Sequence, residues 1–298
     1  MDKKEQIDQS DQSNPWRNYY ASSWTFRLKF FQHLIDKGET NPIRLIRLVE
    51  QIERKCIQSF SEKEQRFGWK KIDFKAPLPT GTDATKTSSF KGESIEIPYY
   101  AKTFYDNFIL DFLQETGDVD CIVELGCGYG RNLFEMYYGG GPRVPYYGGE
   151  LALAGQRLGT SLAELNPDLD FSFHQFDHIA PNLNWLPSYE KVFFMTVHTI
   201  EQVHKIDLNF FRCLIDSAPQ VIGLHLEPFG FQVNSELGPI TKKHDDYFNH
   251  NKWNINFYEV LTRAQDEGLI DIDYIETELF FPEDLINPTS LAIWHKKT

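Results

Sequence analysis

Residues 121–131 read Cys121-Ile122-Val123-Glu124-Leu125-Gly126-Cys127-Gly128-Tyr129-Gly130-Arg131, and the fold expected for the chain depends on them. The first five residues are apolar except for Glu124, which is typical of a strand buried in a parallel sheet. Three glycines follow at every second position, and the residues from Arg131 onward read as a helix. Glycine permits positive φ and lets a ligand approach the backbone, and a helix start offers free N–H groups. The stretch therefore predicts a strand, a tight turn and a helix that can hold a small ligand.

A dinucleotide site is the first alternative for this turn, because its fingerprint, G-x-G-x-x-G, is also rich in glycine. Here the place of the third fingerprint glycine holds Arg131, and Gly130 comes one residue early. Glu124, two places before Gly126, would repel a pyrophosphate, whereas it would attract an ammonium or sulfonium group. An NAD-dependent oxidoreductase therefore stays as an alternative function, with the spacing against it.

Residues 123–130 resemble the E/D-x-G-x-G-x-G motif of class I S-adenosylmethionine (SAM) dependent methyltransferases, and ordered motifs extend the resemblance from residue 99 to the C-terminus. The resemblance implies an α/β fold with a seven-stranded, Rossmann-like, doubly wound sheet whose last two strands form an antiparallel pair. It also implies SAM as the cofactor and transfer of its methyl group to oxygen or nitrogen of an acceptor. The cofactor-binding residues that it implies at the turn are Glu124, Gly126, Cys127, Gly128, Gly130 and Asn132.

Further cofactor-binding positions follow the next strands. Glu150 ends the second expected strand, about twenty residues after the turn, where an acidic side chain binds ribose hydroxyls in α/β nucleotide sites. Asp177, after the third expected strand, matches the methyltransferase position that contacts the adenine amino group, although a plain turn residue is an equally good interpretation. By the same resemblance, the remaining residues expected to line the cofactor are Leu151, Phe176, Thr196 and Val197.

Candidate catalytic residues lie at the ends of the fourth and fifth expected strands, because ligands of open α/β sheets bind beyond the carboxyl ends of the strands. His198 is the first candidate for a general base that removes a proton from the acceptor, since the pKa of histidine lies near neutrality. His225 and Glu227 are the next candidates. A purely hydrogen-bonding role is the alternative for each histidine. The N/D-P-P-Y/F motif of methyltransferases that act on nucleic-acid bases is absent.

The chain divides into a disordered tail (1–14), an N-terminal helical region with a linker (15–98) and a methyltransferase domain (99–298). Within the N-terminal region, residues 79–94 are rich in Gly, Thr, Ser and Lys and read as a loop. Within the domain, residues 228–253 form an insertion that we interpret as a loop or lid on the substrate side. Its aromatic, amide and histidine side chains suit a polar acceptor such as a sugar or an amino-acid-derived metabolite.

Composition limits the partners of the protein. At 298 residues, with 41% hydrophobic and 15% aromatic residues, the chain is expected to bury one large core or two modest ones. Its net charge of −13 argues against a nucleic-acid partner, which needs a basic surface. No run is long and apolar enough for a membrane span, and the scattered cysteines favour reduced thiols. We therefore expect a cytoplasmic protein that acts on a small molecule, with a homodimer as one option for its assembly.

Two further interpretations depend on the same residues. Pairs such as His225 with Glu227 offer imidazole and oxygen ligands, but they do not form a motif with metal-ligand spacing, so no metal is predicted. A methyltransferase-like binding or scaffold protein without turnover is the second alternative function. The presence of Glu124, Gly126, Gly128 and Glu150 argues against a lost cofactor site.

Overall fold

The computed structural model describes residues 15–47, 57–61, 66–69, 85–98, 105–233, 238–280 and 288–298. The expected disordered tail, residues 1–14, lies outside these ranges, as do residues 79–84 of the expected linker loop. None of the helices within the ranges is long and apolar enough to cross a lipid bilayer.

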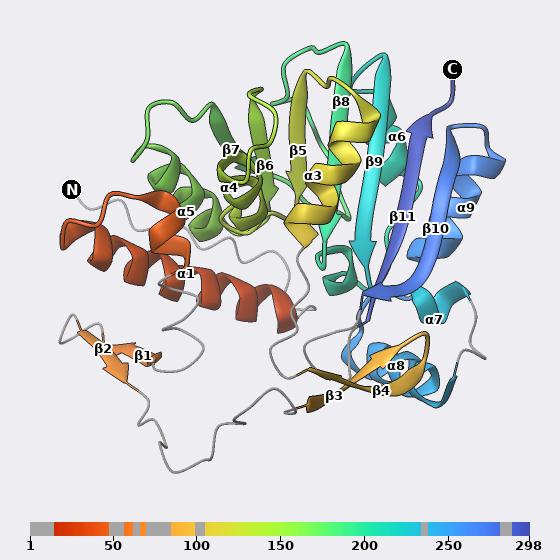
Figure 1. Ribbon diagram of the computed structural model, residues 1–298, viewed down its shortest axis with the longest axis horizontal. Coiled ribbons are helices and arrows are strands. Elements are labelled where there is room, and N and C mark those ends of the chain that lie inside the picture. The colour runs from red at the N-terminus through yellow and green to blue at the C-terminus, as the bar shows by residue number, and fades with distance from the viewer. Residues whose placement is uncertain are drawn as a thin grey trace.

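A seven-stranded sheet forms the centre of the molecule (Figure 1). The last strand of the chain runs antiparallel to both of its neighbours, and all other neighbouring strands of this sheet are parallel to each other. This order and direction are those expected from the methyltransferase resemblance, so the predicted α/β fold class is confirmed. In spatial order the strands are β10 (Ile270–Phe280), β11 (Thr289–Lys296), β9 (Gln220–Glu227), β8 (Lys191–Val197), β5 (Cys121–Leu125), β6 (Tyr146–Glu150) and β7 (Phe171–Gln175).

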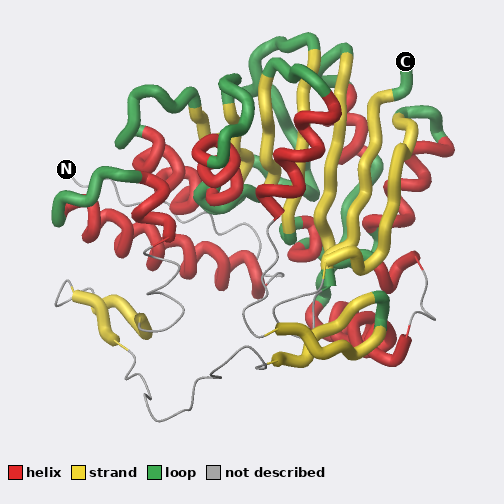
Figure 2. The backbone as a smooth tube through the Cα atoms, viewed as in Figure 1, coloured by secondary structure: helices red, strands yellow, loops and turns green. Residues whose placement is uncertain are grey.

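Helices cover both faces of the sheet (Figures 1 and 2). On one face α3 (Tyr105–Thr116) and α4 (Arg131–Tyr138) pack against Phe193 and Met195 of β8. On the other face α6 (Asn209–Ile215) and α9 (Phe257–Asp266) pack against Val192 and Phe194 of the same strand. Because successive side chains of a strand point to opposite faces, the apolar run of β8 serves both layers. Burying each of these side chains contributes about 1.5–3 kcal/mol to stability.

An N-terminal helix, α1 (Pro15–Asp36), adds a third cluster of buried side chains. Phe30 and Phe31 of α1 are buried against Leu158 and Leu162 of α5 (Leu153–Ala163). Figure 1 shows α1 lying across the lower edge of the sheet, where the parallel strands end. Helix α1 therefore packs on the edge at which ligands bind in this class of fold.

A buried polar chain links β11, β9 and β8. Trp294 of β11 pairs with Gly223 of β9, and a Cβ atom at position 223 would lie 2.1 Å from Trp294 Cε2. Trp294 Nε1 donates to His225 Nε2 at 2.9 Å, and His225 Nδ1 lies 2.9 Å from Thr196 Oγ1. The missing side chain of Gly223 thus makes room for the indole ring that holds His225 in place.

Two sequence predictions for the loops are corrected by the structure. Residues 85–98, partly predicted as a loop, form a hairpin of β3 (Thr85–Phe90) and β4 (Glu93–Pro98). Lys91 and Gly92 both have positive φ, which suits a two-residue hairpin turn. The predicted loop at residues 228–253 is largely helical, with α7 (Gly230–Val233) and α8 (Gly238–Asn251). The N-terminal region is also not purely helical, because β1 (Ile57–Ser61) pairs with β2 (Arg66–Trp69).

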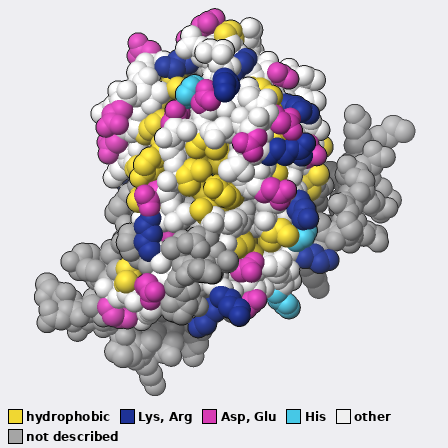
Figure 3. Space-filling view, turned by 90° about the vertical axis from the view of Figure 1, so that its right-hand side faces the viewer, with side chains coloured by type: hydrophobic (Ala, Val, Ile, Leu, Met, Phe, Trp, Pro, Cys, Tyr) yellow, Lys and Arg dark blue, Asp and Glu magenta, His cyan; other side chains and the backbone are white. Residues whose placement is uncertain are grey.

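The side of the molecule formed by β10 and α9 carries charges of both signs around exposed hydrophobic side chains (Figure 3). Tyr274 of β10 is 47% exposed, and His295 bonds to Asp273 at 2.9 Å. Charged side chains along an edge strand such as β10 disfavour pairing with the edge of another sheet. The expected homodimer stays a prediction.

We predict that Gly223→Ala destabilises the protein by about 1–3 kcal/mol, because the added methyl group overpacks the site of the Trp294 ring. The cost should fall by at least about 0.5 kcal/mol in a Trp294→Phe background, because the smaller ring leaves space for the methyl group. Equilibrium unfolding in urea, for the wild type, both single variants and the double variant, measures this coupling. Equal costs of Gly223→Ala in the two backgrounds would contradict the packing account.

Candidate functional site

Three carboxylates lie at the edge where the parallel strands end. They are Glu124 in β5, Glu150 at the end of β6 and Glu227 at the end of β9, and each is less than one-tenth exposed. Burial is the main cause that raises the pKa of Glu124 to about 8 and the pKa values of Glu150 and Glu227 to about 7. Buried ionisable groups with shifted pKa values are typical of functional sites, although structural networks shift them as well.

The backbone N–H groups of the glycine turn are used within the protein. Gly126 N and Cys127 N both donate to Gly149 O, at 2.7 and 3.0 Å. Gly128 N donates to Glu150 Oε2 at 2.8 Å, and Gly130 N donates to Cys127 O at 2.8 Å. A pyrophosphate site needs free N–H donors at this turn. Because these four N–H groups already donate to acceptors within the protein, the turn is poorly suited to bind a dinucleotide.

Gly126 and Gly128 adopt positive φ, 77° and 59°, but the space beside each is filled by protein. A Cβ atom on Gly126 would lie 1.7 Å from Thr199 Oγ1, and one on Gly128 would lie 2.6 Å from the Trp24 ring. We expected these glycines to leave space for a ligand. Their absent side chains instead admit the loop after β8 and the helix α1.

The side chain of Trp24 covers the turn from α1. Its ring lies edge-on to Tyr129 at a centroid distance of 5.8 Å, and the Arg27 guanidinium lies over the Trp24 ring, 4.6 Å from its centroid. Phe31 packs on Tyr129 at 5.3 Å. The turn is thus enclosed between β6 and α1. Sequence reasoning did not single out Trp24, because its contact with Gly128 joins segments that are far apart in the chain.

Glu124 is the carboxylate with the least complete set of partners. Its Oε1 accepts a hydrogen bond from Asn132 Nδ2 at 2.6 Å, whereas its Oε2 is buried without a hydrogen-bond partner among the described residues. Such an oxygen lowers the stability of the fold until a donor or a cation reaches it. Glu124 and Asn132, both predicted to bind the cofactor, are therefore in contact with each other. The unpaired oxygen of Glu124 suits the positively charged end of a ligand. Cys127 lies buried beneath the turn, where burial holds the pKa of its thiol well above the usual value.

Glu150 connects the glycine turn to the loop after β6. Its Oε2 accepts from Gly128 N and its Oε1 accepts from Ala152 N, each at 2.8 Å. Each oxygen keeps a further lone pair, so the carboxylate can still accept hydroxyl groups from a ligand. Leu151 follows it and is 37% exposed.

The loop after β7 runs beside the loop after β6, because Glu150 and Gln175 are paired across these strands. Phe176 is buried, whereas Ile179 is 47% exposed, so exposed apolar groups lie on both loops. Asp177 Oδ1 accepts from Ile179 N at 2.9 Å. This is the turn role that the sequence left open for Asp177, and its adenine contact stays a prediction.

His198, directly after β8, lies in a cluster of polar side chains. Its Nδ1 is 3.2 Å from Glu201 Oε2, and its Nε2 is 2.6 Å from Thr289 Oγ1 and 3.2 Å from Tyr105 Oη. Its backbone has a positive φ of 49°, a conformation that is costly for residues other than glycine and that clusters at functional sites. With Nδ1–H donated to Glu201, Nε2 is the ring nitrogen that can accept a proton, in exchange for its hydrogen bonds to Thr289 and Tyr105.

Tyr105 and Thr289 were missed in the sequence because nothing in their local pattern distinguishes them. Tyr105 begins α3, before the glycine turn, and Thr289 begins β11, near the C-terminus. Only the sheet order brings these two segments to His198. The segment 196–202 contains both His198 and Glu201, and their spacing on one short turn is the signal that could have linked them.

His225 and Glu227, the other two catalytic candidates, are buried and form hydrogen bonds within the protein, and their catalytic role stays a prediction. His225 is fully buried with both ring nitrogens in hydrogen bonds, and burial lowers its pKa to about 3. Glu227 accepts the N–H groups of Thr199 and Ile200 at 3.0–3.2 Å. Both side chains therefore hold the loop that carries His198.

The two predicted cofactor residues at the end of β8 differ in exposure. Thr196 is fully buried against His225, so its side chain belongs to the core. Val197 is half-buried at the last position of β8, beside His198. Val197 is therefore the more accessible of the pair, and its contact with a cofactor stays a prediction.

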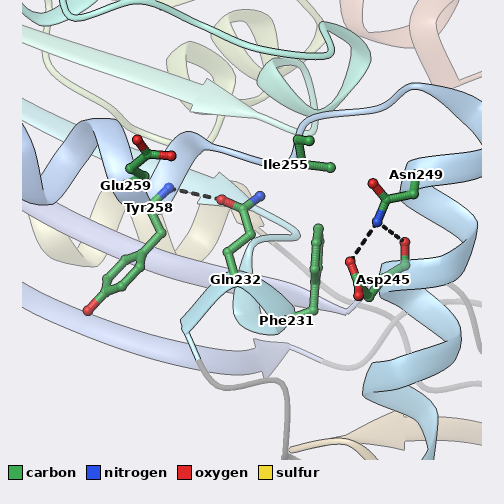
Figure 4. A pocket seen from close by; sticks show the side chains of 7 residues that line it. All are labelled: Phe231, Gln232, Asp245, Asn249, Ile255, Tyr258 and Glu259. Atoms are coloured by element: carbon green, nitrogen blue, oxygen red, sulfur yellow. Dashed lines mark hydrogen bonds between the residues drawn. The ribbon is translucent and has the colours of Figure 1, made fainter.

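A separate pocket of about 380 Å³ lies between α7, α8 and α9 (Figure 4). Gln232 Oε1 accepts from Tyr258 N at 3.0 Å on one wall, and Asn249 Nδ2 donates to Asp245 Oδ1 at 2.8 Å on the other.

Within the described ranges, no group of three or more His, Cys, Asp or Glu side chains is arranged to hold a metal ion.

No family model matches the sequence, and no curated protein matches it. Solved structures are similar in fold. The geranyl diphosphate C-methyltransferase from Streptomyces coelicolor A3(2) has a TM-score of 0.42 at 14% identity, with 65% of this chain and 81% of that chain covered. The plantazolicin methyltransferase BpumL in complex with SAH has a TM-score of 0.42 at 12% identity, covering 65% and 82%. A SAM-dependent methyltransferase from Aquifex aeolicus has a TM-score of 0.40 at 13% identity, covering 65% and 90%.

At these identities the likeness concerns the fold alone. The strand order and strand directions of this sheet are themselves those expected of class I SAM-dependent methyltransferases. The chain thus has a fold similar to that of class I SAM-dependent methyltransferases.

Proposed function

We propose that the protein binds SAM at the glycine turn and transfers its methyl group to oxygen or nitrogen of a polar small molecule. The observation that carries the proposal is the buried Oε2 of Glu124, which has no hydrogen-bond partner among the described residues. In its ionised form this carboxylate matches a cationic ligand end and repels a phosphate, and a bound cation would favour that form by lowering the raised pKa of Glu124. The occupied N–H groups of the turn support the same choice of ligand over a dinucleotide.

The chain offers a partner for each part of the cofactor. Glu124, oriented by Asn132, binds the ammonium group, and the free lone pairs of Glu150 accept ribose hydroxyls. Leu151 and Ile179 offer apolar surface to the adenine ring on adjoining loops. Bound SAM would supply an electrophilic methyl group.

The protein's part in the reaction is to orient the acceptor and to remove its proton. His198 Nε2 accepts that proton from the acceptor in place of the bonds that it makes to Thr289 and Tyr105. Glu201 holds Nδ1–H and stabilises the charged ring that results. The Glu227 carboxylate fixes the loop by accepting hydrogen bonds from the N–H groups of Thr199 and Ile200.

A thermal shift series tests cofactor choice. S-adenosylhomocysteine (SAH) at 100 times its Kd should stabilise the folded protein by about 2.7 kcal/mol, whereas NAD should not stabilise it. Stabilisation by NAD and not by SAH would favour the oxidoreductase alternative.

We predict that Glu124→Gln stabilises the ligand-free protein by about 1–3 kcal/mol at pH 8, because it removes an incompletely paired buried charge. The pKa of Glu124 is raised to about 8 in the folded protein, above its value in the unfolded chain. The loss of folding stability caused by Glu124 is therefore absent at low pH and grows as the pH rises towards 8. The gain should therefore be small at pH 5. Urea unfolding at both pH values measures it, with Glu115→Gln, an exposed site, as the control.

The same Glu124→Gln variant should bind SAH about ten- to hundredfold more weakly, because the ammonium group loses its charged partner. Isothermal titration calorimetry at pH 8 measures the Kd. A variant that gains no stability and binds SAH as the wild type does would remove Glu124 from the site.

We predict that His198→Ala keeps SAH binding but lowers kcat by about a hundred- to ten-thousandfold. Glu201→Gln should lower kcat less and shift the acidic limb of the pH profile to lower pH, because the neutral amide no longer favours the protonated ring. Methyl transfer from labelled SAM into a metabolite extract provides the assay. A near-wild-type kcat for His198→Ala would exclude His198 as the base.

A further inference from the structure

Glu278, near the end of β10, is a second buried carboxylate with an unsatisfied oxygen. It is fully buried, and its Oε1 accepts a weak hydrogen bond from Thr241 at 3.3 Å. Its Oε2 has no hydrogen-bond partner among the described residues. Because β10 runs parallel to β9, Glu278 lies at the same edge of the sheet as His198 and Glu227.

The Glu278 side chain is positioned by a strained stretch of backbone. The register of β10 against β11 shifts between Glu276 and Phe280, and Glu278 has a positive φ of 51°. Its N–H donates to Ser290 Oγ at 2.9 Å instead of joining the regular ladder. Bulges of this kind redirect side chains and are frequent next to active sites. Residues held in such a strained conformation cluster at functional sites.

The surroundings of Glu278 are polar although they are buried. The hairpin strand β3 contacts β10, and β4 contacts α8. Ser89 on β3 is fully buried, and its Oγ also has no hydrogen-bond partner among the described residues. A structural core would place apolar groups here, whereas pockets for polar ligands use such convergent polar groups. The other buried polar side chains on these elements are Ser88, His244, Thr289 and Ser290.

Consecutive residues of β11 connect Glu278 to the candidate base. Thr289 Oγ1 lies 2.6 Å from His198 Nε2, and the next residue, Ser290, accepts the N–H of Glu278 at 2.9 Å. In Figure 1 the hairpin of β3 and β4 and the helix α8 lie below the ends of β9, β10 and β11. Neighbouring residues of β11 thus hold Glu278 and His198 at one edge of the sheet.

Two carboxylates of β10 share one ammonium group among the described residues. Lys91, at the turn of the hairpin, forms an ion pair with Glu276 and donates to Thr277 O. Its charge also acts on Glu278, but one ammonium group cannot neutralise two carboxylates. The group that best complements the region is therefore cationic and rich in hydrogen-bond donors.

We propose that Glu278 binds a protonated amine of the acceptor substrate and so directs the methyl-accepting atom of that substrate towards His198. The acceptor class is then an amine-bearing polar small molecule, such as an amino alcohol or an amino sugar. This inference rests on the proposed methyltransferase function, because it assigns the acceptor of that reaction.

The test compares amines with hydroxyl counterparts of similar shape. The melting temperature of the full chain is measured at pH 8 with about 10 mM ethanolamine, putrescine or glucosamine, and with ethylene glycol, butanediol or glucose. Burial raises the pKa of Glu278 to about 6, so the carboxylate is ionised at this pH. At least one amine should raise the melting temperature by about 2–4 °C more than its counterpart does.

Two variants locate the effect. In Glu278→Gln, which keeps the shape of the side chain, the excess for the amine should disappear. In Asp245→Asn, which removes a carboxylate from the pocket between α7, α8 and α9, it should persist. Circular dichroism and an unchanged stabilisation by SAH establish that Glu278→Gln is folded with an intact cofactor site.

The outcomes separate the two proposals. If SAH does not stabilise the wild type, the proposed function fails. If SAH stabilises it but no amine exceeds its counterpart, the acceptor inference is overturned while the methyltransferase proposal stands. The same holds if the amine excess survives in Glu278→Gln or is lost equally in Asp245→Asn, because the amine would then bind elsewhere.

Discussion

The hydrogen bond from Gly128 N to Glu150 Oε2 is the contact on which the arrangement of the site depends. It ties the turn after β5 to the end of β6 and uses the N–H group that a phosphate would otherwise seek. With this donor engaged, the turn presents carboxylates to a ligand and few free amides. Glu124 then lies behind the turn with one unpaired oxygen, so the polarity of the site favours a cation.

The loop that carries His198 is supported from behind by residues of the core. Glu227 binds the N–H groups at the start of that loop, and His225 holds Thr196 at the end of β8. Trp294 holds His225 in turn, in the space that Gly223 leaves. A disturbance in β11 would therefore reach His198 through hydrogen bonds and close packing.

Much of the fold could be predicted from the sequence because its signals are local. Apolar runs such as 191–197 and the glycine turn specify buried parallel strands and a strand-to-helix connection. The hairpin of β3 and β4 was missed because Ser, Thr, Lys and Gly favour loops, whereas packing against β10 and α8 decides its structure. Composition also predicted a loop at residues 228–253, where two helices form.

The site was harder to predict than the fold, since it depends on contacts between distant segments. Strand ends place Glu124, Glu150 and His198 at one edge, and the sequence is sufficient for that. It is not sufficient to tell His225, whose ring points into the core, from His198, whose ring meets Tyr105 and Thr289. Nor does it reveal that Trp24 covers Gly128, because that contact depends on how α1 packs.

The most direct test of the central claim is a crystal structure of the protein grown with SAH, which retains the amino group of the cofactor. We predict that this nitrogen lies within hydrogen-bond distance of Glu124 Oε2 and that Glu150 accepts the ribose hydroxyls while it keeps its bond to Gly128 N. Density for SAH at another place, or an amino group that does not contact Glu124, would contradict the account.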